Sequence, residues 1–518
     1  MNMMHDSTHH DLLPSRGVQR GIASLTRPMG LWWGLLTLTL VFLLTACADD
    51  DSFSVSKGNL LTFSKDTVCL DTVFSTIPTP TKDFWVYNRS GDGLRLTSVR
   101  LTRGNQTGYR VNVDGTYLSE VSGFKVQHLE LRKNDSIRVF VELTSPTNGQ
   151  MEPQLLEDDL VFTLESGVEQ RVKLSAWTWD AELIRNLHVS EDTELSSQRP
   201  LVVFGGIVVD SAATLRIPAD QTIYFHSGAG IDVYGQLRCE GTAEANVTLR
   251  GDRIDNMFDY LPYDFVSGQW NGITFHPSST GNVIDFTDIH STFNGIVCDS
   301  IPANPLPSAG TGTGTPSEDT ETGLKLQLTN STIHNCQGTG LAVNNCNVEV
   351  WNCQITNTLG PCVDLTGGNM VLSGCTIAQF YPFDSNRGPA LQFTNGTGKP
   401  MTLACVNSLI TGYAEDVIMG NQTDTTTTFD YLFASSILRT PAVEDTLRFK
   451  DITWENPEDT LTTGEKHFKL VDINKQYYDF HLDSLSTAIG KANPLYALPK
   501  DRDGKPRDEA PDIGCYEY

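Results

Sequence analysis

The stretch that decides the fold runs from residue 326 to residue 380, where one pattern occurs three times: LQLTNSTIHNC (326–336), VEVWNCQITNT (348–358) and MVLSGCTIAQF (370–380). Each copy begins 22 residues after the previous one. The apolar residues within a copy lie two apart, which is the spacing of a β-strand with one buried face, whereas a helical repeat would place them three and four apart. The pattern therefore predicts a succession of strands.

The repeat extends in both directions when it is aligned on its isoleucine. Ile333, Ile355 and Ile377 are 22 residues apart, Ile289 stands two periods earlier, and Ile410 follows after an 11-residue insertion. In a parallel β-helix each coil contributes about three short strands, and the coils must stack because one coil cannot bury its own core. We therefore predict an all-β chain in which residues 200–500 form a parallel β-helix.

Two kinds of column in the repeat hold polar or small residues. We predict that the cysteines of the small column are buried small hydrophobes, because one such residue stands two positions before each isoleucine: Thr287, Ser331, Cys353, Cys375 and Ser408. Asparagines recur at two other positions, where stacked amides can bond and a left-handed turn is tolerated: Asn330, Asn352 and Asn407, and Asn335 and Asn357. We interpret these columns as structural.

Residues 58–180 show a different pattern, in which short alternating segments are separated by turn residues. Examples are Tyr109-Arg110-Val111-Asn112-Val113 and the run from Ile137 to Val141, with turn residues at Asp114-Gly115. Strands spaced in this way are typical of a β-sandwich. The sequence predicts such a domain before the β-helix, and its expected work is spacing and presentation.

The N-terminus has the organisation of an export signal. Leu31 to Leu44 is an apolar run of fourteen residues, which is too short to span a bilayer and suits a signal peptide over residues 1–46. The run ends in Leu44-Thr45-Ala46-Cys47, which resembles the bacterial lipobox, so we expect a lipid on Cys47; the alternative is an ordinary signal peptide with a chance cysteine. Acyl chains there would anchor the chain to a membrane.

An acidic tether, residues 47–57, follows the proposed lipid. Asp49, Asp50 and Asp51 resemble the surface-export signal of Bacteroidetes lipoproteins, although a solvated linker would have the same composition. We expect a monomer on the outer membrane that faces the cell exterior. The chain carries 37 basic and 63 acidic residues, a net charge of −26, and this balance argues against a nucleic-acid partner.

Several segments resemble right-handed β-helix lipoproteins of Bacteroidetes. Gln269-Trp270-Asn271-Gly272-Ile273-Thr274-Phe275 followed by Asn294-Gly295-Ile296 resembles their W-x-G-I-x-F…G-I pattern. Residues 501–518 resemble the C-terminal element often called choice-of-anchor Q, with Cys515 where that family usually has alanine. Residues 134–141 are similar to a strand of the Ig-like domains that precede such helices. The resemblance implies an Ig-like sandwich, a right-handed helix with about 22 residues per coil and a C-terminal capping element, but no chemistry.

Two functions remain open on the sequence. One is binding of extracellular polymer, most simply a glycan, or a structural surface role, in which aromatic side chains stack on sugar rings: Trp351, Tyr381 and Phe383, with Tyr413 and Trp270 as further exposed aromatics. The other is a polysaccharide lyase or glycoside hydrolase, in which paired carboxylates or a base act on the sugar. We favour binding, because the only adjacent aspartates of residues 58–518, Asp158-Asp159, lie in the sandwich, and Lys and Arg are sparse in the coils.

The candidate catalytic residues are few. His290 and His334 share one column and could line a face with Asp288 and Asp364, and Arg387 could reach over a groove from the excursion 380–389. No metal site is expected, because no CxxC pair or metal-type spacing occurs among the eleven cysteines. Asp501-Arg502-Asp503-Gly504 lacks the further ligands of a calcium loop and is expected to form a turn. No cofactor is expected, and calcium enters only if the chain is a lyase.

Overall fold

The computed structural model describes residues 52–258, 260–300 and 323–518. Its regular elements are strands and three short 3-10 helices, so the all-β prediction is confirmed. Several predicted features lie outside the described residues: the signal peptide, Cys47, the acidic residues Asp49, Asp50 and Asp51, and the Pro/Gly/Thr/Ser-rich stretch 301–322. No helix in the described ranges is long and apolar enough to cross a membrane.

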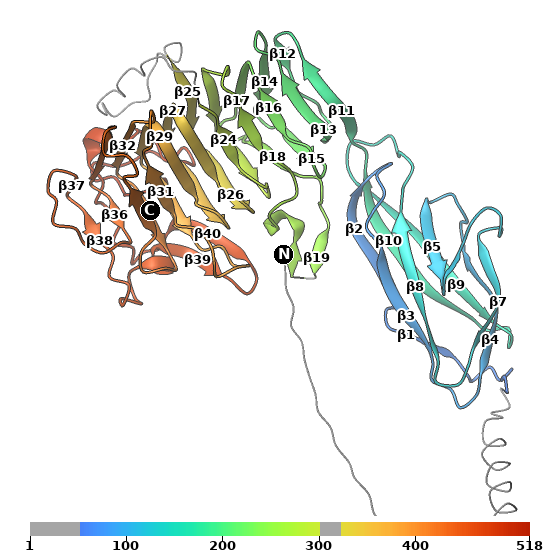
Figure 1. The fold of residues 1–518 in the computed structure, drawn as a ribbon. Coiled ribbons are helices and arrows are strands. Elements are labelled where there is room, and N and C mark those ends of the chain that lie inside the picture. The colour runs from blue at the N-terminus through green and yellow to red at the C-terminus, as the bar shows by residue number, and fades with distance from the viewer. Residues whose placement is uncertain (1–51, 259, 301–322) are drawn as a thin grey trace, which may run out of the picture.

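The N-terminal part consists of two small sheets around one apolar core (Figure 1). Buried and exposed residues alternate along the strands, as in the buried Tyr109, Val111 and Val113 of one strand. One sheet has the order β1 (Leu61–Phe63), β3 (Lys82–Asn88), β8 (Ser136–Leu143), β5 (Tyr109–Val113), β6 (Thr116–Tyr117). The other has the order β2 (Thr67–Phe74), β10 (Glu169–Trp179), β9 (Gln154–Leu164), β4 (Leu94–Leu101), β7 (Lys125–Leu131).

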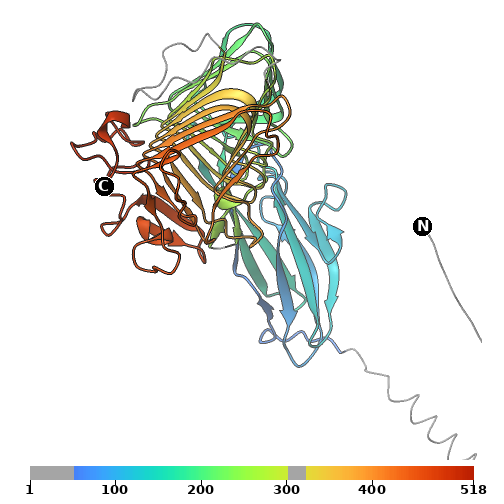
Figure 2. The same cartoon turned by 60° about the vertical axis from the view of Figure 1, so that its left-hand side comes forward.

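The remainder is built on one 26-stranded sheet that winds into stacked coils, each with three faces (Figures 1 and 2). Within the described residues its strands pair in parallel, and each pair joins strands one coil apart. The two small N-terminal sheets followed by this long parallel sheet agree with the predicted order of sandwich and β-helix.

Face 1 carries the candidate site and contains the aligned isoleucines. Its strands are the first parts of β11 (Glu182–Val189) and β13 (Leu201–Val209), then β15 (Thr222–Phe225), β18 (Val247–Gly251), β23 (Thr287–His290), β26 (Thr332–Cys336), β28 (Gln354–Thr358), β30 (Thr376–Gln379), β33 (Leu409–Gly412), β36 (Ile437–Leu438) and β38 (Thr453–Trp454).

Faces 2 and 3 complete each coil, and two long strands bend to serve both. Face 2 holds the second parts of β11 and β13, then β16 (Ile231–Val233), β21 (Ile273–Phe275), β24 (Ile296–Cys298), the first parts of β27 (Leu341–Trp351) and β29 (Val363–Ser373), β31 (Leu391–Thr394) and β34 (Ile418–Asn421). Face 3 holds β12 (Thr193–Glu194), β14 (Thr214–Pro218), β17 (Gln236–Glu240), β22 (Asn282–Asp285), β25 (Leu324–Thr329), the second parts of β27 and β29, β32 (Met401–Val406), β35 (Phe429–Ala434) and β37 (Phe449–Lys450).

The isoleucine column forms the spine of the core. Ile289 pairs in register with Ile333, which continues through Ile355 and Ile377 to Ile410, and all five side chains are fully buried. The small column beside it is also buried: Thr287, Ser331, Cys353, Cys375 and Ser408. Both predictions are confirmed, and all ten described cysteines are free thiols.

The asparagine columns occupy the turns between faces. Asn330, Asn352 and Asn407 have φ between 47° and 52°, and Asn335 and Asn357 have φ of 53° and 56°. This is the left-handed region that asparagine tolerates better than most residues. The Asn352 amide also donates a hydrogen bond of 3.2 Å to Asn330 Oδ1, one coil away. The structural interpretation of these asparagines therefore agrees with their backbone geometry.

Two segments leave the coils and pack against the outside of face 1. The first, which we call the near flap (residues 252–268), follows β18 and contains β19 (Asn256–Phe258), β20 (Leu261–Pro262) and η1 (Tyr263–Phe265). The second, the C-terminal wrap (residues 464–518), contains η2 (Gly464–His467), β39 (Phe468–Asp472), β40 (Tyr477–Leu482) and η3 (Pro494–Tyr496). An apolar cluster joins the wrap to Leu409 and Ile437 of face 1.

Both ends of the β-helix differ from the predicted domain boundaries. The coils begin at Glu182 rather than near residue 200, because β11 pairs in parallel with β13. They end at Trp454, and the chain that follows is the wrap over face 1 rather than further coils to residue 500 and a cap over 501–518. At the start of the helix, Phe74 of the sandwich packs edge-on against Tyr224, with ring centroids 4.9 Å apart, so the two parts share an apolar contact.

Candidate functional site

The outward-pointing side chains of face 1 change from polar to apolar along the β-helix. Side chains two apart on a strand point to the same side, so the neighbours of the buried isoleucines point outward in rows. One row runs in register through Asp288, Thr332, Gln354, Thr376 and Leu409, from polar to apolar. The C-terminal wrap covers the apolar end, which leaves the polar end as the floor of an opening.

That opening is a pocket of about 340 Å³ between the near flap and the C-terminal wrap. Its floor is face 1, one wall is Phe265 of the flap, and the other wall is Tyr478 and Tyr516 of the wrap. The two walls meet at one edge, where the rings of Phe265 and Tyr477 lie 6.3 Å apart. The remaining lining residues are Asn246, Asp288, Thr332, His334, Asn335, Gln354, Thr356, Asn357, Phe480, Arg502 and Asp503.

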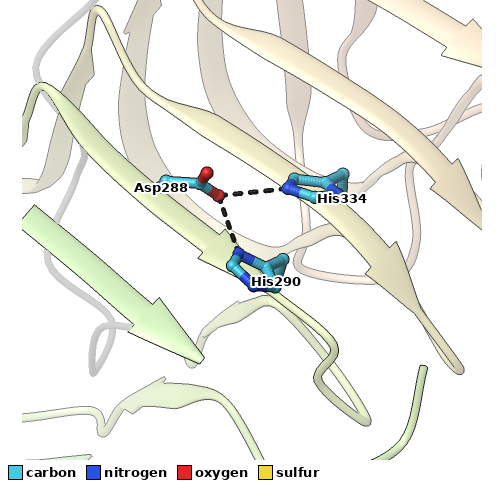
Figure 3. A group of neighbouring side chains, drawn as sticks. All are labelled: Asp288, His290 and His334. Atoms are coloured by element: carbon cyan, nitrogen blue, oxygen red, sulfur yellow. Dashed lines mark hydrogen bonds and ion pairs between the residues drawn. The ribbon is translucent and has the colours of Figure 1, made fainter. Parts of the chain in front are cut away.

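A charged cluster occupies one side of the floor (Figure 3). Asp288 Oδ1 lies 3.1 Å from His290 Nδ1 on the same strand and 3.1 Å from His334 Nε2 on the next coil. His290 and His334 are paired in register, and their rings stack with centroids 4.8 Å apart. The other nitrogen of His290, Nε2, lies 3.3 Å from Asp264 Oδ1 of the flap, and Asp264 also pairs with Arg250.

The cluster strongly shifts the ionisation of its members. Burial raises the pKa of Asp288, but the charges and hydrogen bonds of His290 and His334 outweigh it and hold that pKa well below its usual range. Burial lowers the pKa of His290, but the charge of Asp288 and the bonds to Asp264 and Asp288 raise it to about 9. His290 is therefore an imidazolium at neutral pH, held between two carboxylates.

The opposite side of the pocket is fixed by the C-terminal wrap. Arg502 donates from Nε to Thr332 Oγ1 at 3.2 Å and from Nη2 to Asn246 Oδ1 at 3.1 Å, which holds its guanidinium against face 1. Asp503 Oδ2 lies 2.7 Å from His481 Nε2. The turn predicted at residues 501–504 is present, and it places Arg502 and Asp503 on the pocket wall.

Two polar atoms of the pocket have no partner. The Asn357 side-chain oxygen and the Tyr478 hydroxyl are both buried, and neither makes a hydrogen bond within the described chain. A buried polar group without a partner costs about 1–3 kcal/mol. Because both residues line the pocket, a small turn of either side chain would let a bound molecule supply the missing bond.

The structure brings together some of the predicted catalytic residues and separates the others. His290 and His334 lie together with Asp288, as their shared column suggested. Asp364 is on face 2, where it pairs with Ala342 and Gln392, so the expectation that it lines the same face is wrong. Arg387 donates to the Tyr381 carbonyl at 2.9 Å and lies over the Tyr413 ring, which fixes it within its own excursion.

The expected exposure of several aromatics is also corrected. Trp351 is 3% exposed, Tyr381 is 5% exposed and Trp270 is 1% exposed, so none of the three offers a ring to a sugar in this structure. Tyr381 instead shares a hydrogen bond of 2.8 Å with Ser267 of the near flap. Phe383 is 45% exposed, as predicted, but it is not part of the pocket lining.

Sequence reasoning missed most of the pocket walls. The wall residues Phe265, Tyr478 and Tyr516, and Asp264 beside His290, lie outside the repeat, and nothing in the 22-residue period links them to face 1. The signal that could have pointed to them is the loss of polarity along the outward row of face 1, because an exposed apolar stretch at its end requires a covering segment.

Comparison with known proteins supports the fold more than the function. The sequence matches the family described as right-handed β-helix region over residues 184–377 and 318–398. No curated protein matches it significantly. A solved protein of unknown function from Porphyromonas gingivalis W83 is 15% identical, with 26% of this chain and 59% of that chain covered and a TM-score of 0.18.

A family 123 glycoside hydrolase from Clostridium perfringens, studied for glycolipid glycan hydrolysis, is 7% identical, with 26% of this chain and 30% of that chain covered and a TM-score of 0.18. The present chain therefore covers less than two thirds of either structure. At these TM-scores neither likeness carries an argument about fold or function.

Proposed function

We propose that this chain binds a glycan in the face 1 pocket. The observation that carries the proposal is that two residues lining one aromatic-walled pocket, Asn357 and Tyr478, each hold a buried polar atom without a partner in the described chain. A sugar offers hydroxyl groups that both donate and accept, so it can bond to either atom once the side chain turns toward the pocket. A volume of about 340 Å³ lies within the range of about 300–1,000 Å³ that ligand pockets have.

The lining suits a hydroxyl-rich ligand better than a polyanion. Amide and hydroxyl groups dominate the floor, with Thr332, Gln354 and Thr356 in neighbouring rows. Phe265 and Tyr478 supply apolar ring surface at the walls, as sugar rings need. The one guanidinium of the lining, Arg502, is already paired with Asp503, and His334 is paired with Asp288, so the lining offers no unpaired positive charge to a strongly anionic ligand.

Other pockets support this function less well. A pocket of about 690 Å³ lies between β2 and the near flap, with Phe258 and Tyr260 on its rim. A smaller one of about 220 Å³ at the same junction is lined by Pro78 and Pro80. No buried, unpartnered polar atom of the described chain belongs to either lining.

The test is binding of the full chain, purified in detergent, to a glycan microarray, followed by titration of the best ligand. Tyr478→Phe removes only the unpartnered hydroxyl, and we expect affinity to fall about 3–10-fold, which is the worth of one hydrogen bond. Tyr413→Phe is the matched control, because its hydroxyl is also buried and unpartnered but lies outside the pocket. No glycan ligand, or equal loss in both variants, would refute the proposal.

A second function, a polysaccharide lyase or glycoside hydrolase, is favoured by the cluster of Asp288, His290 and His334 at the pocket floor. A histidine beside carboxylates is a common arrangement for general acid–base catalysis. The same incubations are therefore assayed for new reducing ends and for absorbance of unsaturated uronate, with and without calcium. If the unaltered chain forms product and the His334→Gln variant does not, the function is catalysis and not binding alone.

The proposed location is the outer membrane, with the chain held on its outer side by lipid on Cys47. The apolar run, the lipobox-like residues and the acidic tether support this location. The sandwich would hold the pocket away from the lipid surface. Metabolic labelling with a fatty acid should label the chain and not Cys47→Ala, and protease added to whole cells should cut the labelled chain. Labelling of Cys47→Ala would refute the anchor, and protection from protease would refute the outward orientation.

A further inference from the structure

Three side chains that can bind a metal ion lie close together in face 1: Asp288, His290 and His334. One nitrogen of each imidazole and one oxygen of the carboxylate all lie within 4.8 Å of one another. Figure 3 shows both imidazoles turned toward the carboxylate, from two neighbouring strands. The three side chains are held there by the fold, because Asp288 and His290 are two apart on β23, and His334 is in register with His290 on β26.

The distances suit ligands of a small cation. Two ligand atoms that bind one tetrahedral ion at about 2.0–2.2 Å are about 3.3–3.6 Å apart. Asp288 Oδ1 is 3.1 Å from each imidazole nitrogen, and all three atoms lie within 4.8 Å, so the two imidazoles would have to close by up to about 1.3 Å to share one ion. Two imidazoles and one carboxylate are a donor set used by zinc and by non-haem iron, and hard ions such as calcium prefer oxygen alone.

A second, independent observation is the outer contact of His290. Its Nε2 lies 3.3 Å from Asp264 Oδ1, and Asp264 is itself held by Arg250. Histidines that bind metals usually direct their other ring N–H to a carboxylate or carbonyl in this way, which fixes the ring and its tautomer. His290 would then present Nδ1 to the ion and keep its Nε2 proton on Asp264.

The cluster is also open on one side. Asp288 and His334 line the pocket, with 33% and 20% of their side chains exposed, while His290 is 8% exposed. Three protein ligands with a free side are the arrangement of reactive rather than purely structural zinc sites, where water or a ligand takes the fourth position.

We infer that Asp288, His290 and His334 form a binding site for one divalent transition-metal ion, with Asp264 as its positioning residue. The ion would replace the proton shared between the imidazoles and the carboxylate, since metal ligands bind in deprotonated form. The inference goes beyond glycan binding, because the ion is held by protein atoms alone. Its test contains no sugar, so either proposal can fail without the other.

The experiment uses the full chain in detergent, stripped with a chelator and then equilibrated with Zn²⁺. Bound metal is measured by elemental analysis after gel filtration, and we expect one ion per chain. Asp288→Asn and His334→Gln should lose it, and Asp264→Asn should weaken binding about 10–100-fold. His276→Gln is the matched control, because His276 pairs with Asp232 at 2.9 Å in another part of the helix and lacks a second imidazole.

A second readout does not depend on any variant. Co²⁺ in place of Zn²⁺ should give visible ligand-field bands typical of mixed nitrogen and oxygen ligands, and far-UV circular dichroism checks that each variant keeps its strands. Absence of stoichiometric metal and of cobalt bands in the unaltered chain would overturn the inference. Metal retained in a folded His334→Gln variant, or lost in His276→Gln, would overturn the assignment of these ligands.

Discussion

The Tyr516 hydroxyl donates a hydrogen bond of 2.8 Å to Gln354 Oε1, which joins the end of the chain to the floor of the pocket across 162 positions. Tyr516 is buried, and its ring lies 4.1 Å from that of His481. The same segment buries Phe480 and Ile513 against face 1. The C-terminal wrap is therefore a wall of the site and part of the core, rather than a cap on the last coil.

Tyr516→Phe tests this role of the wrap. The variant keeps the ring but leaves Gln354 Oε1 buried without its donor, so we expect a loss of about 1–3 kcal/mol of unfolding free energy. Urea denaturation followed by fluorescence measures it. Tyr518→Phe is the control, because Tyr518 is 56% exposed and should change stability by no more than about 0.5 kcal/mol. Equal effects would mean that the bond does not hold the wrap.

Gly272 lies where the coil turns after the buried Trp270, and we expect it to tolerate no side chain. Its φ is 85°, and a Cβ would lie 1.7 Å from the Asn294 carbonyl oxygen of the next coil. Gly228→Ala is the matched control, since Gly228 has φ of 80° and open space around a Cβ. The control should cost about 1–2 kcal/mol from strain alone, whereas Gly272→Ala should fail to give soluble, folded chain. Comparable soluble yields from both would contradict the close approach of the coils.

The repeat predicted the core well and the site poorly, and the reason is physical. The register between two coils follows from the sequence period itself. Residues one period apart, such as Ile333 and Ile355, are stacked when main-chain hydrogen bonds pair their strands. The pocket depends on packing between segments far apart in sequence. Nothing around Tyr516 indicates Gln354 as its partner, and nothing around Asp264 indicates His290.

The prediction that several aromatic side chains are exposed was wrong for a related reason. The sequence predicts Trp351 and Tyr381 to be exposed on the long flat face of the β-helix. Both are buried, and Tyr381 is covered by a segment outside the repeat, where it bonds to Ser267 of the near flap. His290 and His334 were found because they share a column, which is information that the period itself contains.

Thiol reactivity should distinguish the described cysteines. Cys69 is exposed and nine others are buried, and burial raises the pKa of thiols such as Cys239 and Cys405 to about 12. Because the thiolate is the reactive form, we expect Cys69 to react rapidly with a thiol reagent in the native chain and the nine buried thiols only after unfolding. A Cys69→Ser variant is the control and should lose the fast phase. Several fast thiols in that variant would show that the core is not packed as described.

A buried ionic network anchors the wrap at the end of the helix. Glu455, 5% exposed, accepts hydrogen bonds from Arg439 Nη1 at 2.9 Å and Thr411 Oγ1 at 3.0 Å, and its Oε1 lies 3.0 Å from His467 Nε2. Glu455→Gln removes the charge that balances these groups, and we expect a loss of about 3–5 kcal/mol of stability. Glu465→Gln, on an exposed side chain of η2, should change little. Urea denaturation of both variants measures the difference, and equal stabilities would contradict the role of the network.

The same carboxylate should make stability depend on pH in the acid range. Burial raises the pKa of Glu455, but the hydrogen bond and charge of His467, with Arg439 and Thr411, outweigh it and lower that pKa below its ordinary value of 4.5. A carboxyl whose pKa is lower in the folded chain binds protons more readily when unfolded. Its stabilisation is therefore complete above about pH 4.5 and is lost as pH falls through the folded value.

The unfolding free energies of the unaltered chain and of Glu455→Gln, compared at each pH, isolate this contribution, because the other carboxylates titrate in both chains. We expect a constant difference at neutral pH that shrinks below about pH 4.5. A difference that is constant down to acid unfolding would show that the loss in Glu455→Gln comes from packing and not from the charge.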